Sequence, residues 1–236
     1  MSYEFHTEEY KGCTIRIVQE DSPCDPRKDF DHIGTLTPYD EPGYNSGMGQ
    51  EQTEEFMWGL AEKQITIREK LAGITYANAY SNWIESDDGS DEMVYPVLDE
   101  LVEMALVDNV IIPYDWDEIG YGRSFSETDD WKNCSGYAWM SMDTARKNWS
   151  GTDDEVRKHA EACLRAELEE LNNWAQGNVA GWVAEDPDGN QIESVWGFYP
   201  DEYPKEWDYP ISEARSHIDQ WHADQHELET HLCMNI

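Results

Sequence analysis

The sequence predicts an α+β fold: a small, mainly antiparallel sheet with a C-terminal hairpin, covered by about four helices. Three observations lead to this fold class. Short runs rich in β-branched residues occur at 13–18 and 110–112, as is typical of strands. Thr152 and Glu155 have the capping-box spacing that opens a helix. Residues 187–190 read Pro-Asp-Gly-Asn, which favours a tight turn between two strands.

The N-terminal part is expected to contain one strand, one long loop and one helix. The strand is 13–18. Residues 20–50 are dense in Pro, Gly, Asp and Ser, which favour turns, so we expect a long ordered loop there, and loops of such length often carry function. Apolar residues recur at helical spacing over 51–71, which predicts a helix that stops near Gly73. Residues 74–84 fit a helix or a strand.

The middle of the chain alternates between helix and strand patterns. An apolar stripe over 93–105 predicts a second helix. The strand at 110–112 is expected to end at Pro113 and to lead into an acidic loop that extends to residue 133. Residues 136–142 are the next expected strand.

The C-terminal part has the clearest local signals. The helix that begins after Thr152 is expected to bury an apolar face and to end at Gly177 in a left-handed cap. The hairpin follows it, and 211–232 close the chain as a polar helix that carries several His. We expect one domain over 1–236, with 205–236 as a peripheral helical extension.

The net charge is extreme. Sixteen Lys plus Arg against 51 Asp plus Glu give −35, which makes a compact chain repel itself at low ionic strength. At about 1 M salt the Debye length falls to roughly 3 Å, so a salt-rich cytoplasm would screen this repulsion. The alternative is that carboxylates imitate nucleic-acid phosphates and so attract a DNA-binding protein. The small number of Lys and the even spread of the acids favour salt adaptation, and one surface can serve both purposes.

Other composition features exclude several classes of protein. An apolar share of 39% with 12% aromatic residues is too high for a disordered chain. No apolar run reaches the roughly 18 residues of a membrane span, and the N-terminus lacks a signal-peptide pattern. The five Cys form no close pair, so we expect reduced thiols. The expected location is therefore the cytoplasm of a high-salt cell, with the virion as the alternative.

We expect no cofactor, with a divalent cation as the alternative, and two groups of side chains are the candidates for binding it. Asp115, Asp117 and Asp130 lie in the expected acidic loop, and hard cations take oxygen ligands. In so acidic a chain a solvated loop gives the same pattern. His222 and His226 are four residues apart on the expected terminal helix and can share one face, although the zinc-protease pattern HExxH is absent. A solvated His-rich helix is the alternative there.

Catalytic residues cannot be assigned from the sequence. Cys134 begins an expected strand, but a reactive thiolate needs a base or a positive field, and its surroundings are negative, so we interpret it as structural. No phosphate-binding loop, dinucleotide glycine pattern or nucleophile elbow occurs. Most of the 11 Trp are expected in the core. Trp207 and Trp221 are the candidates for contact with a partner.

Several strings, taken in order, resemble an uncharacterised family of proteins encoded mainly by phages, archaeal viruses and mobile elements. The strings are DSPCDPRKDFDHIGTLTPY, IIPYDWDEIGYGRSF, WKNCSGYAWMSM, ELNNWAQGNVAGWVAE and ESVWGFYP. The last resembles the family's closing Ser-Cys-Trp-Gly-Phe-Tyr-Gly motif, but Val195 stands at the motif's Cys and Pro200 at its last Gly. The acidic loop and the segment before residue 136 also depart from the family pattern. The resemblance covers most of 20–200 and implies a viral or mobile-element accessory protein from a salt-adapted system.

The sequence therefore suggests a salt-adapted accessory protein, encoded by a virus or plasmid, that binds a host or viral protein. Inhibition of a host defence system through an acidic, nucleic-acid-like surface is the form we expect. The alternatives are a metal-dependent enzyme of unknown substrate and a structural or assembly component of a virion. Direct binding to nucleic acid is disfavoured, because −35 charges repel phosphates. The oligomeric state stays open.

Overall fold

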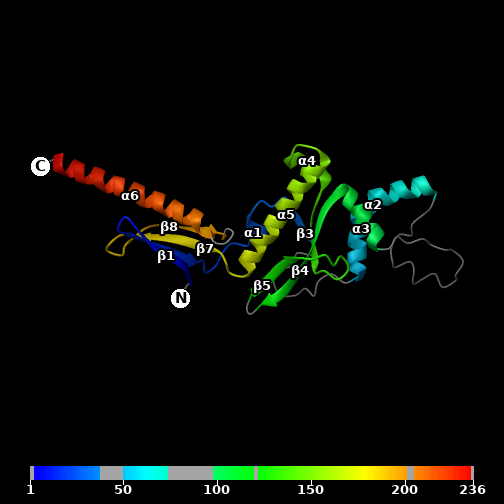
Figure 1. Cartoon of the computed structure of the whole chain (residues 1–236), viewed down its shortest axis with the longest axis horizontal. Coiled ribbons are helices and arrows are strands. Elements are labelled where there is room, and N and C mark those ends of the chain that lie inside the picture. Colours follow the sequence, from blue (N-terminus) through cyan, green and yellow to red (C-terminus); the bar gives the residue numbers. More distant parts are fainter. Residues whose placement is uncertain (1–2, 38–49, 74–97, 120–121, 201–204, 235–236) are drawn as a thin grey trace. The chain divides into compact units, whose positions relative to one another are not determined.

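The chain is described by a computed structural model, except for residues 1–2, 38–49, 74–97, 120–121, 201–204 and 235–236. It divides into two compact units. Unit 1 comprises Met1–Phe30, Ile119–Ser124 and Glu170–Ile236, and unit 2 comprises Asp31–Glu118 and Phe125–Glu169. The α+β class is confirmed (Figure 1), but the strands are divided between two four-stranded sheets where one was expected. The single domain expected from the sequence stays a prediction.

The sheet of unit 1 has the strand order β1-β2-β7-β8. The expected strand β2 (Cys13–Gln19) and the expected hairpin of β7 (Ala180–Glu185) and β8 (Gln191–Phe198) are confirmed. Strand β1 (Glu4–Tyr10) was not predicted, because its acidic sequence has no apolar alternation. Lys11 and Gly12 have φ of 51° and 82° and turn β1 back onto β2.

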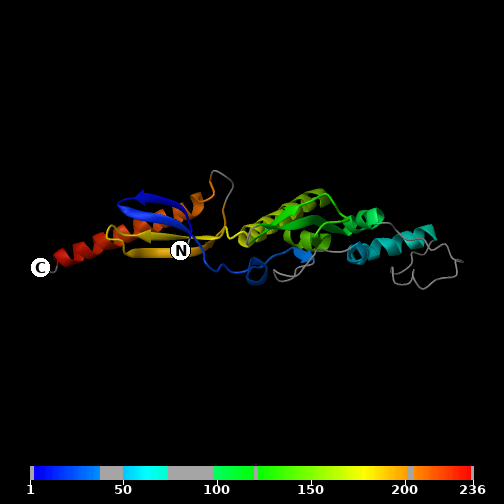
Figure 2. The ribbon, with the colours of Figure 1, turned by 90° about the horizontal axis from the view of Figure 1, so that it is seen from below.

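Helix α6 (Asp208–Met234) packs along one face of this sheet (Figures 1 and 2). Ile211, Ala214 and Ile218 recur at helical spacing and are buried against Ile15 and Trp182 of the sheet. The first half of the helix is thus part of the hydrophobic core, so the description of 205–236 as a peripheral extension is wrong for that half.

The sheet of unit 2 has the strand order β3-β6-β4-β5, and β6 (Gly136–Ser141) is the expected strand. Strand β3 (Thr35–Thr37) lies within the stretch expected to be a loop. Helix α1 (Pro26–Asp29), which belongs to unit 1, also interrupts that stretch. Residues 38–49 of the expected loop lie outside the described residues.

Strand β4 (Asn109–Ile119) does not end at Pro113, which corrects the sequence-based boundary. Pro113 pairs with Tyr137, while its carbonyl accepts a hydrogen bond from Thr128 N at 3.1 Å. In a strand the N and the C=O of one residue point to the same side, so the missing N–H faces away from β6. Strand β5 (Gly122–Glu127) ends just before Thr128, so the proline costs no ladder bond. Much of the expected acidic loop is therefore strand.

The helices of unit 2 follow the sequence more closely. The predicted helices correspond to α2 (Gln50–Ala72), α3 (Leu98–Asp108) and α5 (Asp153–Ala175). Of α5, the residues through Glu169 belong to this unit. Residues 74–97, which include the ambiguous segment and the expected start of α3, lie outside the described residues. Helix α4 (Met142–Asn148) was not predicted; its N-cap is Ser141, whose side chain accepts a hydrogen bond from Thr144 N.

The capping box of α5 is confirmed. Thr152 N donates to Glu155 Oε2 at 2.8 Å, and Glu155 N donates to Thr152 Oγ1 at 3.4 Å. Gly177 has φ of 73°, as the predicted left-handed cap requires. The predicted apolar face is buried at Val156, Ala160, Leu164, Leu168 and Leu171.

Candidate functional site

The acidic candidates occupy separate positions in unit 2. The Asp115 carboxylate on β4 accepts hydrogen bonds from Ser135 N at 2.9 Å and Ser135 Oγ at 3.3 Å, and so joins β4 to the residue before β6. Asp130 closes its own turn by accepting from Asn133 and Lys132, and these bonds lower the pKa of the Asp130 carboxyl. Asp117 is exposed on β4. Asp115 and Asp130 therefore have local structural roles.

The structure brings one of the two histidine candidates, His222, near a thiol. His222 Nε2 lies 3.9 Å from Cys13 Sγ, and its ring meets that of Trp221 edge to face. Burial, followed by the charges of Asp186 and Glu9, raises the pKa of the Cys13 thiol, so the thiol stays protonated. His226 is exposed one turn further along α6. Across the part of the chain that the structure describes, no group of three or more His, Cys, Asp or Glu side chains is placed to hold a metal ion.

The two thiols of unit 2 are poor nucleophiles, because their pKa values are raised. Cys134 is 1% exposed, and burial raises its pKa, which agrees with its interpretation as a structural residue. Cys163 on α5 lies 3.6 Å from Glu167 Oε1, and burial together with the Glu167 charge raises its pKa to about 11.

We expect Cys163 to react with iodoacetamide at pH 8 about a hundredfold more slowly in the folded protein than in urea, because so high a pKa leaves almost no thiolate. Mass spectrometry of timed digests measures the rate, and the exposed Cys24 is the internal control. Equal rates at Cys163 in the folded and unfolded chains would contradict the assigned environment.

The two tryptophans expected to contact a partner pack against the core of unit 1. The ring of Trp207 lies 5.0 Å from that of Phe5, and Trp221 is partly buried beside the core. Trp196 on β8 has the more exposed indole, at 46%. The sequence analysis expected most of the 11 Trp in the core and did not single out Trp196, and only the strand pairing reveals which face of the sheet it occupies.

A buried carboxylate that the sequence analysis did not single out binds the backbone just before β3, in the segment that joins β2 to β3. Glu167 on α5 is 8% exposed, and it accepts hydrogen bonds from Ile33 N at 2.8 Å and Gly34 N at 3.1 Å. A Cβ on Gly34 would lie 2.4 Å from Leu164 Cδ2 and 2.6 Å from Glu167 Oε2, so only glycine allows this approach. We call Glu167, Ile33 and Gly34 the backbone clamp. The signal for it is an acid within an apolar helical face.

The strings that carried the family resemblance meet in pairs within each unit. In unit 2, Gly34 of the string DSPCDPRKDFDHIGTLTPY contacts α5 through the backbone clamp. Asp115 of IIPYDWDEIGYGRSF accepts a hydrogen bond from Ser135 of WKNCSGYAWMSM. In unit 1 the indole of Trp196, from ESVWGFYP, lies over Gly181, from NVAGWVAE. These contacts help to hold each unit together.

Comparison of the chain with protein-family models, curated proteins and solved structures finds no match. The resemblance therefore stays a prediction. Within the described ranges, no helix combines the length and the apolar character needed to cross a bilayer.

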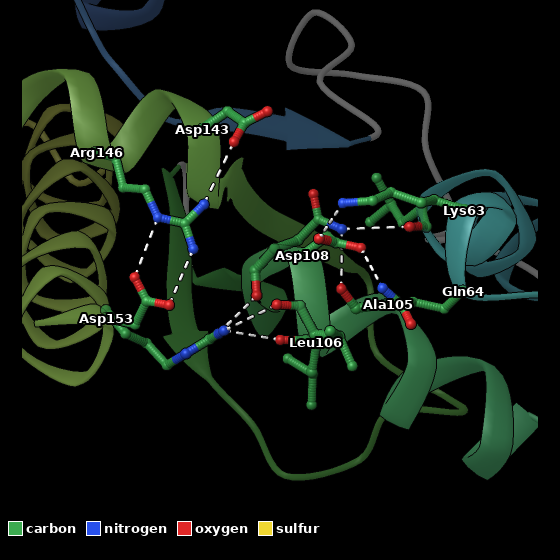
Figure 3. Close-up of polar contacts among 12 residues, drawn as sticks. Lys63, Gln64, Ala105, Leu106, Asp108, Asp143, Arg146 and Asp153 are labelled. Atoms are coloured by element: carbon green, nitrogen blue, oxygen red, sulfur yellow. Dashed lines mark hydrogen bonds and ion pairs between the residues drawn. The ribbon is translucent and has the colours of Figure 1, made fainter. Parts of the chain in front are cut away.

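Many basic side chains of unit 2 are held by acids or by carbonyl groups. Figure 3 shows Arg146 between Asp153 and Asp143, with Nη2 3.1 Å from Asp153 Oδ2. In the same view Lys63 Nζ lies 2.6 Å from Asp108 Oδ1, and Gln64 donates to the other oxygen. These bonds lower the pKa of the Asp153 and Asp108 carboxyls, so both stay ionised well below neutral pH.

Further basic side chains in both units are bound by carbonyl groups or by acids. Arg157 donates to Asn109 O at 2.7 Å and Leu106 O at 2.9 Å, which satisfies carbonyls at the end of α3. Further ion pairs join Arg165 to Glu127, Arg215 to Glu8, Lys11 to Asp219 and Arg16 to Glu185. Since 51 acids face 16 Lys and Arg, most carboxylates would lack a basic counterpart even if every cation were paired.

Proposed function

We propose that the chain is a non-enzymatic, virus- or plasmid-encoded accessory protein that binds a positively charged surface of a host protein. The observation that carries this proposal is the large excess of carboxylates on a folded chain in which several basic side chains of each unit are already paired with acids. A nucleic-acid-binding protein of a defence system is the target that fits such a surface.

The chemistry of the target follows from that of phosphate recognition. Proteins bind nucleic acid through Lys and Arg that neutralise phosphates. A carboxylate presents two oxygens to a guanidinium much as a phosphate does, often in a bidentate pair. A rigid acidic surface can therefore occupy a groove that otherwise holds DNA or RNA.

Salt adaptation and this form of binding are compatible. At about 1 M salt, charges act over roughly 3 Å, so long-range attraction is lost. Contacts at hydrogen-bond distance persist, because partly buried pairs are screened much less. Recognition in a salt-rich cell would then depend on where the folded surface places its carboxylates, and not on net charge alone.

The test is an affinity capture at native ionic strength, with the chain immobilised and a lysate of the organism that carries the gene passed over it. Polyglutamate of matched total charge is the control ligand, because it has the charge without the fold. We expect the chain to retain one or a few nucleic-acid-binding proteins that polyglutamate does not retain. Retention of the same proteins by both ligands, or of none by the chain, would refute the proposal.

A further inference from the structure

The sheet of unit 1 has a second face, opposite the one that α6 covers. Strand pairing places Val18, Gly181 and Trp196 in one row across β2, β7 and β8, and Arg16, Val183 and Ser194 in the next row. Because side chains alternate along a strand, these residues point away from the face that carries Ile15, Ile17 and Trp182. We call this second face the outer face of the sheet.

An indole lies open on the outer face. A Cβ on Gly181 would come within 2.2 Å of Cε3 and 2.5 Å of Cδ2 of Trp196, so the indole rests directly on the glycine backbone. Its contact with Gly181 fixes one side of the ring, while 46% of the residue remains exposed. The backbone that follows is fixed as well, because Gly197 N donates to Glu20 Oε2 at 3.0 Å. Trp196 thus presents a solvent-facing indole whose position is fixed by its contact with Gly181.

Carboxylates outnumber basic side chains among the described residues of the outer face. Glu4 lies on the same cross-strand row through its pairing with Val18, and Glu9 pairs with Thr14 on the same face. Glu20 adjoins the indole through its bond to Gly197. The guanidinium of Arg16 is bound to Glu185, with Nη2 2.5 Å from Oε1. The open aromatic ring therefore has one carboxylate, Glu20, bonded to the residue that follows it, and it shares an acidic face with Glu4 and Glu9, which lie three strand spacings away on β1, roughly 14 Å or more from β8.

The geometry points to one kind of occupant: we propose that the outer face of the sheet docks an Arg- or Lys-bearing segment of a partner protein, with Trp196 as the anchor. This inference rests on the proposed function and names the surface that performs it. Tryptophan is the best aromatic partner for a cation, because its ring face is electron-rich. Glu20 and the other carboxylates of the face strengthen that preference, whereas the same charges repel the phosphates of a nucleic acid.

Central aromatic side chains commonly contribute most of the affinity of an interface, and charged groups at the border select the partner. The outer face has this arrangement, with Trp196 at one edge, Glu20 bonded to the next residue, and Glu4 and Glu9 on the opposite edge strand. Loss of the indole should therefore weaken binding far more than loss of an exposed aromatic residue elsewhere in the unit.

The test is calorimetric titration with a synthetic peptide of alternating Gly and Arg, and with a Gly-Gln peptide as the neutral control. We expect the wild type to bind only the arginine peptide, and Trp196→Leu, which keeps bulk but lacks a π-face, to bind it about tenfold more weakly. Trp196→Phe should fall between the two. Tyr209→Ala, which removes a residue 64% exposed on α6, should match the wild type.

Circular dichroism confirms folding of each variant before titration. Equal affinity of Trp196→Leu and the wild type, or no preference of the wild type for the arginine peptide, would overturn the docking surface. The capture experiment separates this inference from the proposed function. If immobilised Trp196→Leu retains the same nucleic-acid-binding proteins as the wild type, the docking surface is wrong and the function stands. If the wild type retains none, the function is wrong, and the peptide titration still decides the surface.

Discussion

Replacing Glu167 with Ala is expected to lower the free energy of unfolding by about 3 kcal/mol. The carboxylate is 8% exposed and accepts the N–H groups of Ile33 and Gly34, so its removal leaves buried donors unpaired and opens a cavity. Urea unfolding followed by circular dichroism measures the change. The matched control is Glu169→Ala on the exposed side of the same helix, with an expected change within about 0.5 kcal/mol.

Gly34→Ala tests the other side of the backbone clamp. The added methyl group would overlap Leu164 Cδ2 and Glu167 Oε2, so we expect a loss of about 1 to 3 kcal/mol. In combination with Glu167→Ala, the loss should be smaller than the sum of the two single losses, because one of the overlapping groups is gone. Single variants that unfold at the same urea concentration as the wild type would contradict the clamp.

A second large effect is expected from salt. Raising KCl from 0.05 M to 2 M should raise the midpoint of thermal unfolding by about 15 °C, which for a chain of this length corresponds to roughly 5 kcal/mol. The cause is the net charge of −35 on a folded chain in which several basic side chains, such as Arg146 and Arg165, are already paired. Screening relieves repulsion among the remaining carboxylates, which the unfolded chain keeps further apart.

Sucrose at equal osmolality is the control for this measurement, since it is excluded from protein surfaces without screening charge. We expect it to shift the midpoint much less than KCl does. An unfolding midpoint that is equally high in nearly ion-free buffer would remove the argument for a salt-rich habitat.

The elements that the sequence predicted best are those with signals contained in a few neighbouring residues. The capping box of Thr152 and Glu155 locates the start of α5, and the turn at 187–190 locates the hairpin of β7 and β8. Strand β1 has no such signal, because it is acidic on both faces and is held by pairing with β2. Pro113 misplaced the end of β4, because whether a proline breaks a strand depends on which neighbour its nitrogen faces.

The division into two sheets and the contacts of the sites depend on residues far apart in the sequence. Glu167 contacts backbone more than 130 residues away, and its partners cannot be identified from helical periodicity alone. Trp196 could be recognised as exposed only once its row across the sheet was known, since Trp182 on the neighbouring strand is fully buried. The acidic surface, by contrast, was evident from composition, because pairing consumes so few of the carboxylates.

The central claim is that the folded acidic surface takes the place of nucleic acid on a basic partner. Equilibrium competition tests it most directly: the captured partner is saturated with fluorescein-labelled duplex DNA, the chain is added, and fluorescence anisotropy reports the DNA still bound. We expect one equivalent of the folded chain to release the DNA, while polyglutamate of matched total charge, which lacks the fold, does not. A stable ternary complex, with anisotropy unchanged at saturating chain, would contradict it.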